Sequence, residues 1–153
     1  MKKEDLRKAW RTAAIVTGAI ISAIFMYALV VEAASRALSL NAPFTGGAAA
    51  ALKYVLYILG AVAVVSLKFI RPAMETRKDT ATEALTALVK EAVVTAAVCE
   101  VPAFAGLMLF FLTGGYGDFY LLAFISAAAE LFFFPKYRVW DEFIRNGYGL
   151  TME

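Results

Sequence analysis

Two glutamates stand in long stretches of sequence that contain no other charged residue. Glu100 lies in the apolar stretch 92–112 and Glu130 lies in the apolar stretch 119–134. A charged side chain at the centre of a bilayer costs about 2.5–3.5 kcal/mol or more, so carboxylates found there usually have a function. A low dielectric also favours the uncharged form of a carboxyl group. The sequence therefore predicts that Glu100 and Glu130 bind a proton or a cation within the membrane.

A second interpretation applies to both residues. A protonated glutamate can instead donate a hydrogen bond to a neighbouring helix and stabilise its packing. Glu130 also stands near the end of its apolar stretch, from which its side chain can extend toward the lipid headgroups. The two interpretations remain open at the level of sequence.

Pro102 follows two residues after Glu100. It removes a backbone donor and frees a carbonyl one turn earlier, near Val98, so a helix kink is expected there. Freed carbonyls beside a buried carboxyl group help to coordinate ions in some transporters. Membrane helices also tolerate prolines that have no such role.

Four apolar segments are long enough to position these residues inside a bilayer. The chain has 153 residues, of which 61% are hydrophobic, well above the level of a soluble domain. A spanning helix needs roughly 20 mostly apolar residues. We expect a single all-α membrane domain over residues 1–153, with helices at about 12–34, 48–70, 80–113 and 119–135. Residues 14–20 weakly resemble residues 92–98, which leaves open a duplicated two-helix hairpin.

The basic residues predict the orientation of these helices. They gather in the two tails and in the connection between the second and third helices, whereas the other two connections hold almost none. Basic residues favour the cytoplasmic side. We therefore expect a multi-pass protein of the cell membrane with both termini in the cytoplasm. The residues that carry this prediction are Lys2, Lys3, Arg7, Lys8, Arg11, Lys68, Arg71, Arg77, Lys78, Lys90, Lys136, Arg138 and Arg145.

Two cytoplasmic features follow from the same pattern. Thr80 and Glu83 have the spacing of a capping box, so the third helix should begin well before the membrane and project from it. Residues 137–149 should form an amphipathic interfacial helix, with Val139, Trp140 and Phe143 on one face. Both segments are candidate docking sites for protein partners.

Several classes of function are disfavoured. The chain has no histidine, and its one cysteine, Cys99, cannot form a paired-cysteine metal site. No phosphate-binding glycine motif is present. The net charge of +2 is too small to suggest nucleic acid. We therefore expect no enzymatic activity, no cofactor, no metal and no nucleic-acid partner.

Two short motifs resemble the proteolipid c subunit of rotary ATPases. Arg71-Pro72 stands in a polar connection between helices, and Glu100 is followed by Gly106-Leu107 at the distance typical of that family. The resemblance covers about a third of the chain. It implies that Glu100 is the ion-binding carboxylate and that Arg71-Pro72 is the signature of the cytoplasmic turn.

Two hypotheses about function follow. In the first, the protein is a proteolipid-like, homo-oligomeric membrane subunit that binds or translocates protons or cations through Glu100 and Glu130. In the second, it is a structural or accessory membrane protein, without transport activity, that docks partners through residues 80–91 and the C-terminal tail. Membrane lipid is the surrounding partner in both.

Overall fold

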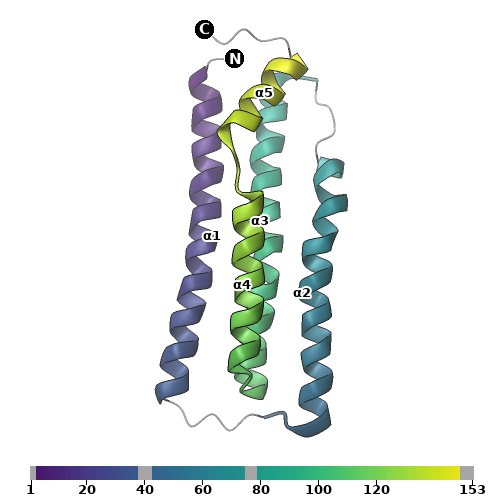
Figure 1. The fold of residues 1–153 in the computed structure, drawn as a ribbon. Coiled ribbons are helices and arrows are strands. Elements are labelled where there is room, and N and C mark those ends of the chain that lie inside the picture. Colours follow the sequence, from purple (N-terminus) through teal and green to yellow (C-terminus); the bar gives the residue numbers. More distant parts are fainter. Residues whose placement is uncertain (1–2, 38–42, 75–78, 149–153) are drawn as a thin grey trace.

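The computed structural model describes residues 3–37, 43–74 and 79–148, which form five helices (Figure 1). Four are long and apolar enough to span a membrane, as the sequence predicts. These are α1 (Lys3–Ala37), α2 (Gly46–Met74), α3 (Ala81–Thr113) and α4 (Tyr116–Phe133), and they are followed by the short α5 (Tyr137–Tyr148).

Two helix boundaries differ most from the prediction. α1 already begins at Lys3, because the charged residues before position 12 continue the helix beyond its apolar part. α2 does not end at Arg71-Pro72 but continues through Pro72 to Met74. Pro72 has no N–H to donate to the carbonyl oxygen of Lys68, and α2 ends two residues beyond it.

α3 is the central helix of the bundle. It packs against α4, α2 and α1, and Figure 1 shows α3 and α4 between the two outer helices. Half of its most apolar stretch is buried (50%), against 17% for α1 and 11% for α2. The side chains of α3 therefore decide what lies inside the bundle.

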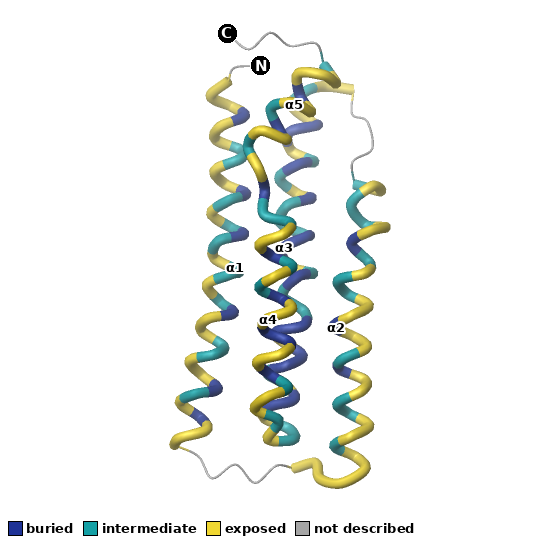
Figure 2. The backbone as a smooth tube through the Cα atoms, in the orientation of Figure 1, coloured by how far each residue is buried: buried dark blue, intermediate teal, exposed yellow. Residues whose placement is uncertain are grey.

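The outer faces of the bundle are apolar. Phe25, Val62 and Phe124 are exposed by 66%, 58% and 73%, and Figure 2 shows exposed residues along the full length of α1 and α2. Apolar side chains on this scale are not stable in contact with water, whereas lipid chains solvate them. This distribution agrees with four helices in a bilayer.

Close approach of α3 and α4 depends on Gly106. A methyl group at this position would lie 3.1 Å from the Cβ of Leu122 and 3.1 Å from the carbonyl oxygen of Phe119. Small residues at a helix contact let two backbones approach in this way. Gly60 has a similar but looser role on α2, where a methyl group would lie 3.4 Å from Pro102.

One end of the bundle extends into a small separate core, which includes Leu6 of α1, Leu85 of α3 and Ile144 of α5. Thr80 caps α3 by accepting a hydrogen bond from the backbone N–H of Glu83, as the capping box predicts. Trp140 and Ile144 of the predicted interfacial helix face this core, while Val139 and Phe143 stay more exposed. We call this the basic end, because α1 begins here, α5 lies here and most of the basic residues are found here.

Candidate functional site

Glu100 lies on the face of α3 that borders α1. The hydroxyl group of Tyr27 donates a hydrogen bond of 2.5 Å to its Oε1. Both side chains are partly buried and line a shallow groove of about 220 Å³ together with Ala97, Val101 and Phe104. The carboxyl group is thus held by one donor from a neighbouring helix and can be approached from the side of the bundle.

Glu130 has a different environment. It is 1% exposed, and its Oε1 has no hydrogen-bond partner among residues 3–37, 43–74 and 79–148. It lies within electrostatic range of Glu100 and of Cys99. The two predicted glutamates therefore interact electrostatically, with Glu100 partly buried at the edge of the bundle and Glu130 inside it.

Register along α3 and α4 shows what Glu130 faces. The hydroxyl group of Ser126 donates a hydrogen bond to the carbonyl oxygen of Cys99. Because α3 and α4 are antiparallel, four residues forward on α4 correspond to four residues back on α3. Glu130 is accordingly opposite Thr95, whose Oγ1 is buried and lacks a partner within the part of the chain that the structure describes.

Thr17 of α1 adds a third polar group at this level. Its hydroxyl oxygen is also buried without a partner in the described part of the chain. Thr17 stands midway between Trp10, whose indole N–H donates to the carbonyl oxygen of Pro135 at 2.9 Å, and Ile24, which packs in the core shared with α4. Buried polar groups that lack a direct partner are commonly satisfied by water. Thr17, Thr95 and Glu130 are thus three buried side chains with polar atoms that lack a partner in the described part of the chain.

Pro102 is buried within α3, which continues as one helix from Ala81 to Thr113. Its ring packs against Gly60 of α2. The sequence predicts a freed carbonyl near Val98. In the structure the neighbouring carbonyl group, that of Cys99, accepts the hydrogen bond of Ser126. Pro102 therefore has a direct packing role, and the kink expected from the sequence stays a prediction.

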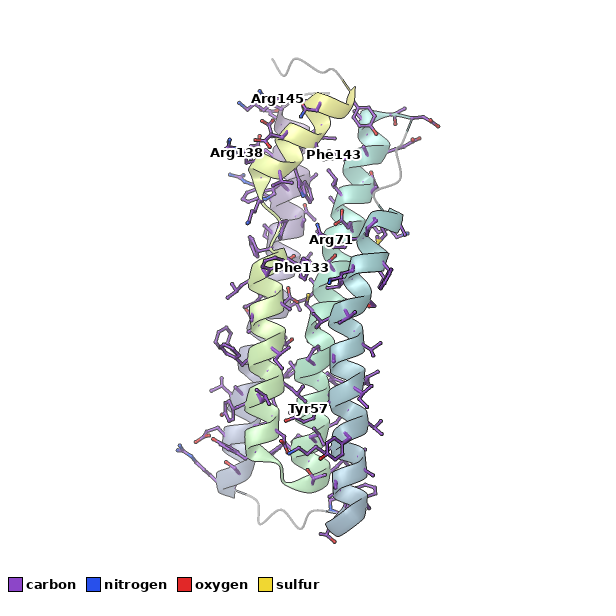
Figure 3. The ribbon with its side chains drawn as sticks, turned by 45° about the vertical axis from the view of Figure 1, so that its right-hand side comes forward. Tyr57, Arg71, Phe133, Arg138, Phe143 and Arg145 are labelled. Atoms are coloured by element: carbon purple, nitrogen blue, oxygen red, sulfur yellow. The ribbon has the colours of Figure 1, made fainter. Side chains whose placement is uncertain are left out.

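Arg71 is placed in the last turns of α2 and not in a cytoplasmic turn. Its Nε lies 2.7 Å from Oε1 of Glu91, whose side chain is 8% exposed. The guanidinium group also lies over the ring of Phe133, 5.2 Å from its centroid. Figure 3 shows Arg71 and Phe133 side by side, between α2 and the end of α4. This ion pair connects α2 to α3 at the start of the basic end.

Charged residues at the other end are also paired between helices. Lys53 of α2 lies 2.8 Å from Oδ1 of Asp118 on α4, and the hydroxyl group of Tyr57 donates to the same oxygen at 2.8 Å. Figure 3 shows Tyr57 directed from α2 toward the bundle. Glu91 and Asp118 thus have cationic partners. Glu100 and Glu130 differ from them, because the described residues provide no ion pair for either.

Sequence reasoning did not identify Tyr27, Thr17, Thr95 or Glu91. A signal for two of them was present in the spacing of α3. Glu91 and Thr95 share the buried face on which Cys99 and Pro102 lie, at intervals of three to four residues. Tyr27 gave no comparable signal, because which residue of α1 meets Glu100 depends on how the two helices are aligned.

The fold and the site together define a multi-pass α-helical membrane protein with a carboxyl pair in its spanning region. Within the described residues, no group of three or more potential metal ligands comes together. No family model, no curated protein and no solved structure matches the chain. Its function must therefore be argued from the site itself.

Proposed function

We propose that the protein binds and exchanges protons, or a monovalent cation, at Glu100, with Glu130 as an internal second carboxyl group. The observation that carries this proposal is the position of Glu100. Its carboxyl group lies in the apolar stretch 92–112 of α3 and has no ion-pair partner among the described residues. It borders a groove that opens to the side of the bundle and lies within electrostatic range of the buried carboxyl group of Glu130. Ionisable residues in such positions are typical of proton and ion pathways.

The two carboxyl groups would act as a coupled pair. A second negative charge near the first is unfavourable in a low dielectric, so loss of a proton from one carboxyl group would oppose its loss from the other. Glu100, which borders the open groove, would be the group that exchanges its proton, whereas Glu130 is sealed in the bundle. The hydroxyl group of Tyr27 would stabilise the carboxylate of Glu100 each time the proton leaves.

The resemblance to the proteolipid c subunit of rotary ATPases belongs to this proposal. It assigns the ion-binding role to the same residue, Glu100. The chain differs from that family in having Gly60 as the one glycine within the apolar part of its second helix, and in having Pro102 after the carboxylate. We propose that the likeness extends to the chemistry of Glu100.

We also propose a cytoplasmic location for the basic end, because the positive-inside rule predicts it.

Carbodiimide labelling tests this proposal. These reagents modify protonated carboxyl groups in apolar surroundings, and mass spectrometry locates the product. We expect labelling of Glu100 that fades as the pH rises. The variant Tyr27→Phe, which lacks the hydroxyl donor, should label several times faster at the same pH, and Glu142→Gln, which changes an exposed carboxylate on α5, should label as the unchanged protein does.

Proton flux gives a second readout. Vesicles that contain the protein and a trapped pH dye should equilibrate an imposed pH gradient faster than protein-free vesicles, and Glu100→Gln should abolish the difference. If Glu100 does not label at any pH and Glu100→Gln leaves the flux unchanged, the proposal is wrong. The compact core of the basic end would then favour the accessory function, tested by whether loss of α5 prevents recovery of partner proteins.

A further inference from the structure

A groove runs along the bundle where α2 ends and α4 passes into α5. Two adjoining cavities form it, of about 180 Å³ and about 270 Å³, and both are lined by Arg71 and Phe133. The smaller cavity continues toward Lys136 and Trp140, and the larger continues toward Lys68. The groove is separate from the Glu100 site, which lies between α1 and α3.

Cations surround this groove. Lys68, Arg71 and Lys136 line it from α2 and from the segment between α4 and α5, whereas Glu91 is the one carboxylate among its lining residues. Glu91 pairs with Nε of Arg71 and offsets a single charge. The groove therefore has an excess of positive charge, which suits an anionic group.

The inner wall of the groove offers a further polar contact. Thr95 lines the smaller cavity, is 3% exposed and has a hydroxyl oxygen without a partner among the described residues. A hydroxyl group is a donor as well as an acceptor, so it can bind an oxyanion that the cations attract. The unpartnered hydroxyl and the cations thus point to the same class of ligand.

On one side of the groove the exposed residues are apolar, and on the other side they are charged. Along the spanning parts of α2 and α4, Phe69 and Phe132 are exposed by 75% and 76%. In the other direction lies the basic end, with its charged helix α5 (Figure 3). An occupant must have a charged head beside the cations and an apolar portion along the phenylalanines.

We propose that this groove binds the headgroup of an anionic phospholipid, with its acyl chains along the exposed faces of α2 and α4. Lys68, Arg71 and Lys136 bind the phosphate group, and Glu91 and Phe133 orient the guanidinium group of Arg71. Basic pockets between membrane helices at the cytoplasmic interface are suited to such lipids. The inference is independent of proton exchange at Glu100.

Native mass spectrometry of the full-length protein in a non-ionic detergent tests it. Dioleoyl phosphatidylglycerol and dioleoyl phosphatidylcholine are added in turn, since they have the same acyl chains and differ in net charge. We expect saturable binding of the anionic lipid at least tenfold tighter than that of the zwitterionic one. Lys68→Gln with Lys136→Gln should weaken it about fivefold for each cation removed.

Arg138→Gln with Arg145→Gln is the matched control. It removes the same charge from α5, but neither residue lines the groove, and Arg138 is paired with Glu142 on the surface. This control should bind the anionic lipid as the unchanged protein does. All four substituted side chains are exposed, so both double variants should fold.

Three outcomes would overturn the inference. The two lipids could bind equally well, or the control pair could weaken binding as much as the groove pair, which would indicate diffuse attraction to charge. Inorganic phosphate, compared with chloride at equal ionic strength, could also displace the lipid completely. The groove would then bind phosphate itself and not a lipid.

Discussion

Arg71 and Glu91 show how a single residue pair can connect two membrane helices. Glu91 is almost fully buried on α3, whereas Arg71 on α2 is 38% exposed in its side chain. Removal of one partner from a buried pair leaves an uncompensated charge, which is more costly than replacement of both partners by apolar residues. The pair thus stabilises the bundle mainly by preventing an isolated carboxylate at Glu91.

A double-mutant cycle tests this interpretation. We expect Arg71→Met to lower the free energy of unfolding by about 2 kcal/mol, since Arg71 is only partly buried and solvent screens part of the interaction. Glu91→Leu alone is the second single variant, and Arg71→Met combined with Glu91→Leu should recover most of the loss. Unfolding by a denaturing detergent in mixed micelles measures all three variants. If the two single losses simply add, the residues are not coupled and the pair has no stabilising role.

Single residues also show the limit of sequence reasoning. Glu100 and Glu130 could be identified because a carboxylate is conspicuous in an apolar stretch. Their different environments could not be predicted, because burial depends on which face of each helix meets its neighbours. Tyr27, the donor to Glu100, lies 73 positions away in the chain and is brought there by helix alignment alone.

At the scale of elements, Gly106 sets the distance between α3 and α4. We expect Gly106→Ala to lower the free energy of unfolding by about 1–3 kcal/mol, because the added methyl group would lie 3.1 Å from a backbone oxygen that cannot move aside. Gly18→Ala is the matched control, since nothing lies within 4 Å of a methyl group at that position. It should be neutral or slightly stabilising.

The same unfolding titration in mixed micelles compares the two glycines. Equal effects at Gly106 and Gly18 would mean that a methyl group at Gly106 does not disturb the α3–α4 contact. A larger loss for Gly106→Ala that disappears with Leu122→Ala would attribute the contact to that leucine. A loss that remains would attribute it to the backbone of Phe119.

The elements were largely predictable because lipid imposes a simple rule. Every backbone polar group within a bilayer must be satisfied inside its own segment, so apolar stretches of sufficient length form helices. The ends were less predictable. The residues at 3–11 and Pro72 lie beyond the apolar stretches, where hydropathy no longer applies and local packing at the basic end determines the helix. The central position of α3 also had no sequence signal, since all four stretches are apolar on every side.

At the scale of the whole molecule, the two ends differ in charge and in structure. The basic end contains the start of α1, the projecting part of α3 and the amphipathic α5, packed around their own core. At the opposite end, α3 turns into α4 through Gly114 and Gly115 without further helices. A bilayer centred on the apolar stretches would leave the basic end outside the hydrocarbon region, and the positive-inside rule predicts that this end lies in the cytoplasm.

Cysteine accessibility tests this orientation. Cys99 is the one native cysteine of the chain and is fully buried, so the unchanged protein should not react with a membrane-impermeant maleimide and provides the background. Ser35→Cys and Asn146→Cys place exposed thiols in the last turns of α1 and α5, at opposite ends of the bundle. In intact cells we expect Ser35→Cys to label and Asn146→Cys to label only after the membrane is opened. The reverse pattern would place the basic end outside the cell. The proposed lipid groove would then face the outer leaflet, and Glu100 would exchange protons nearer that side.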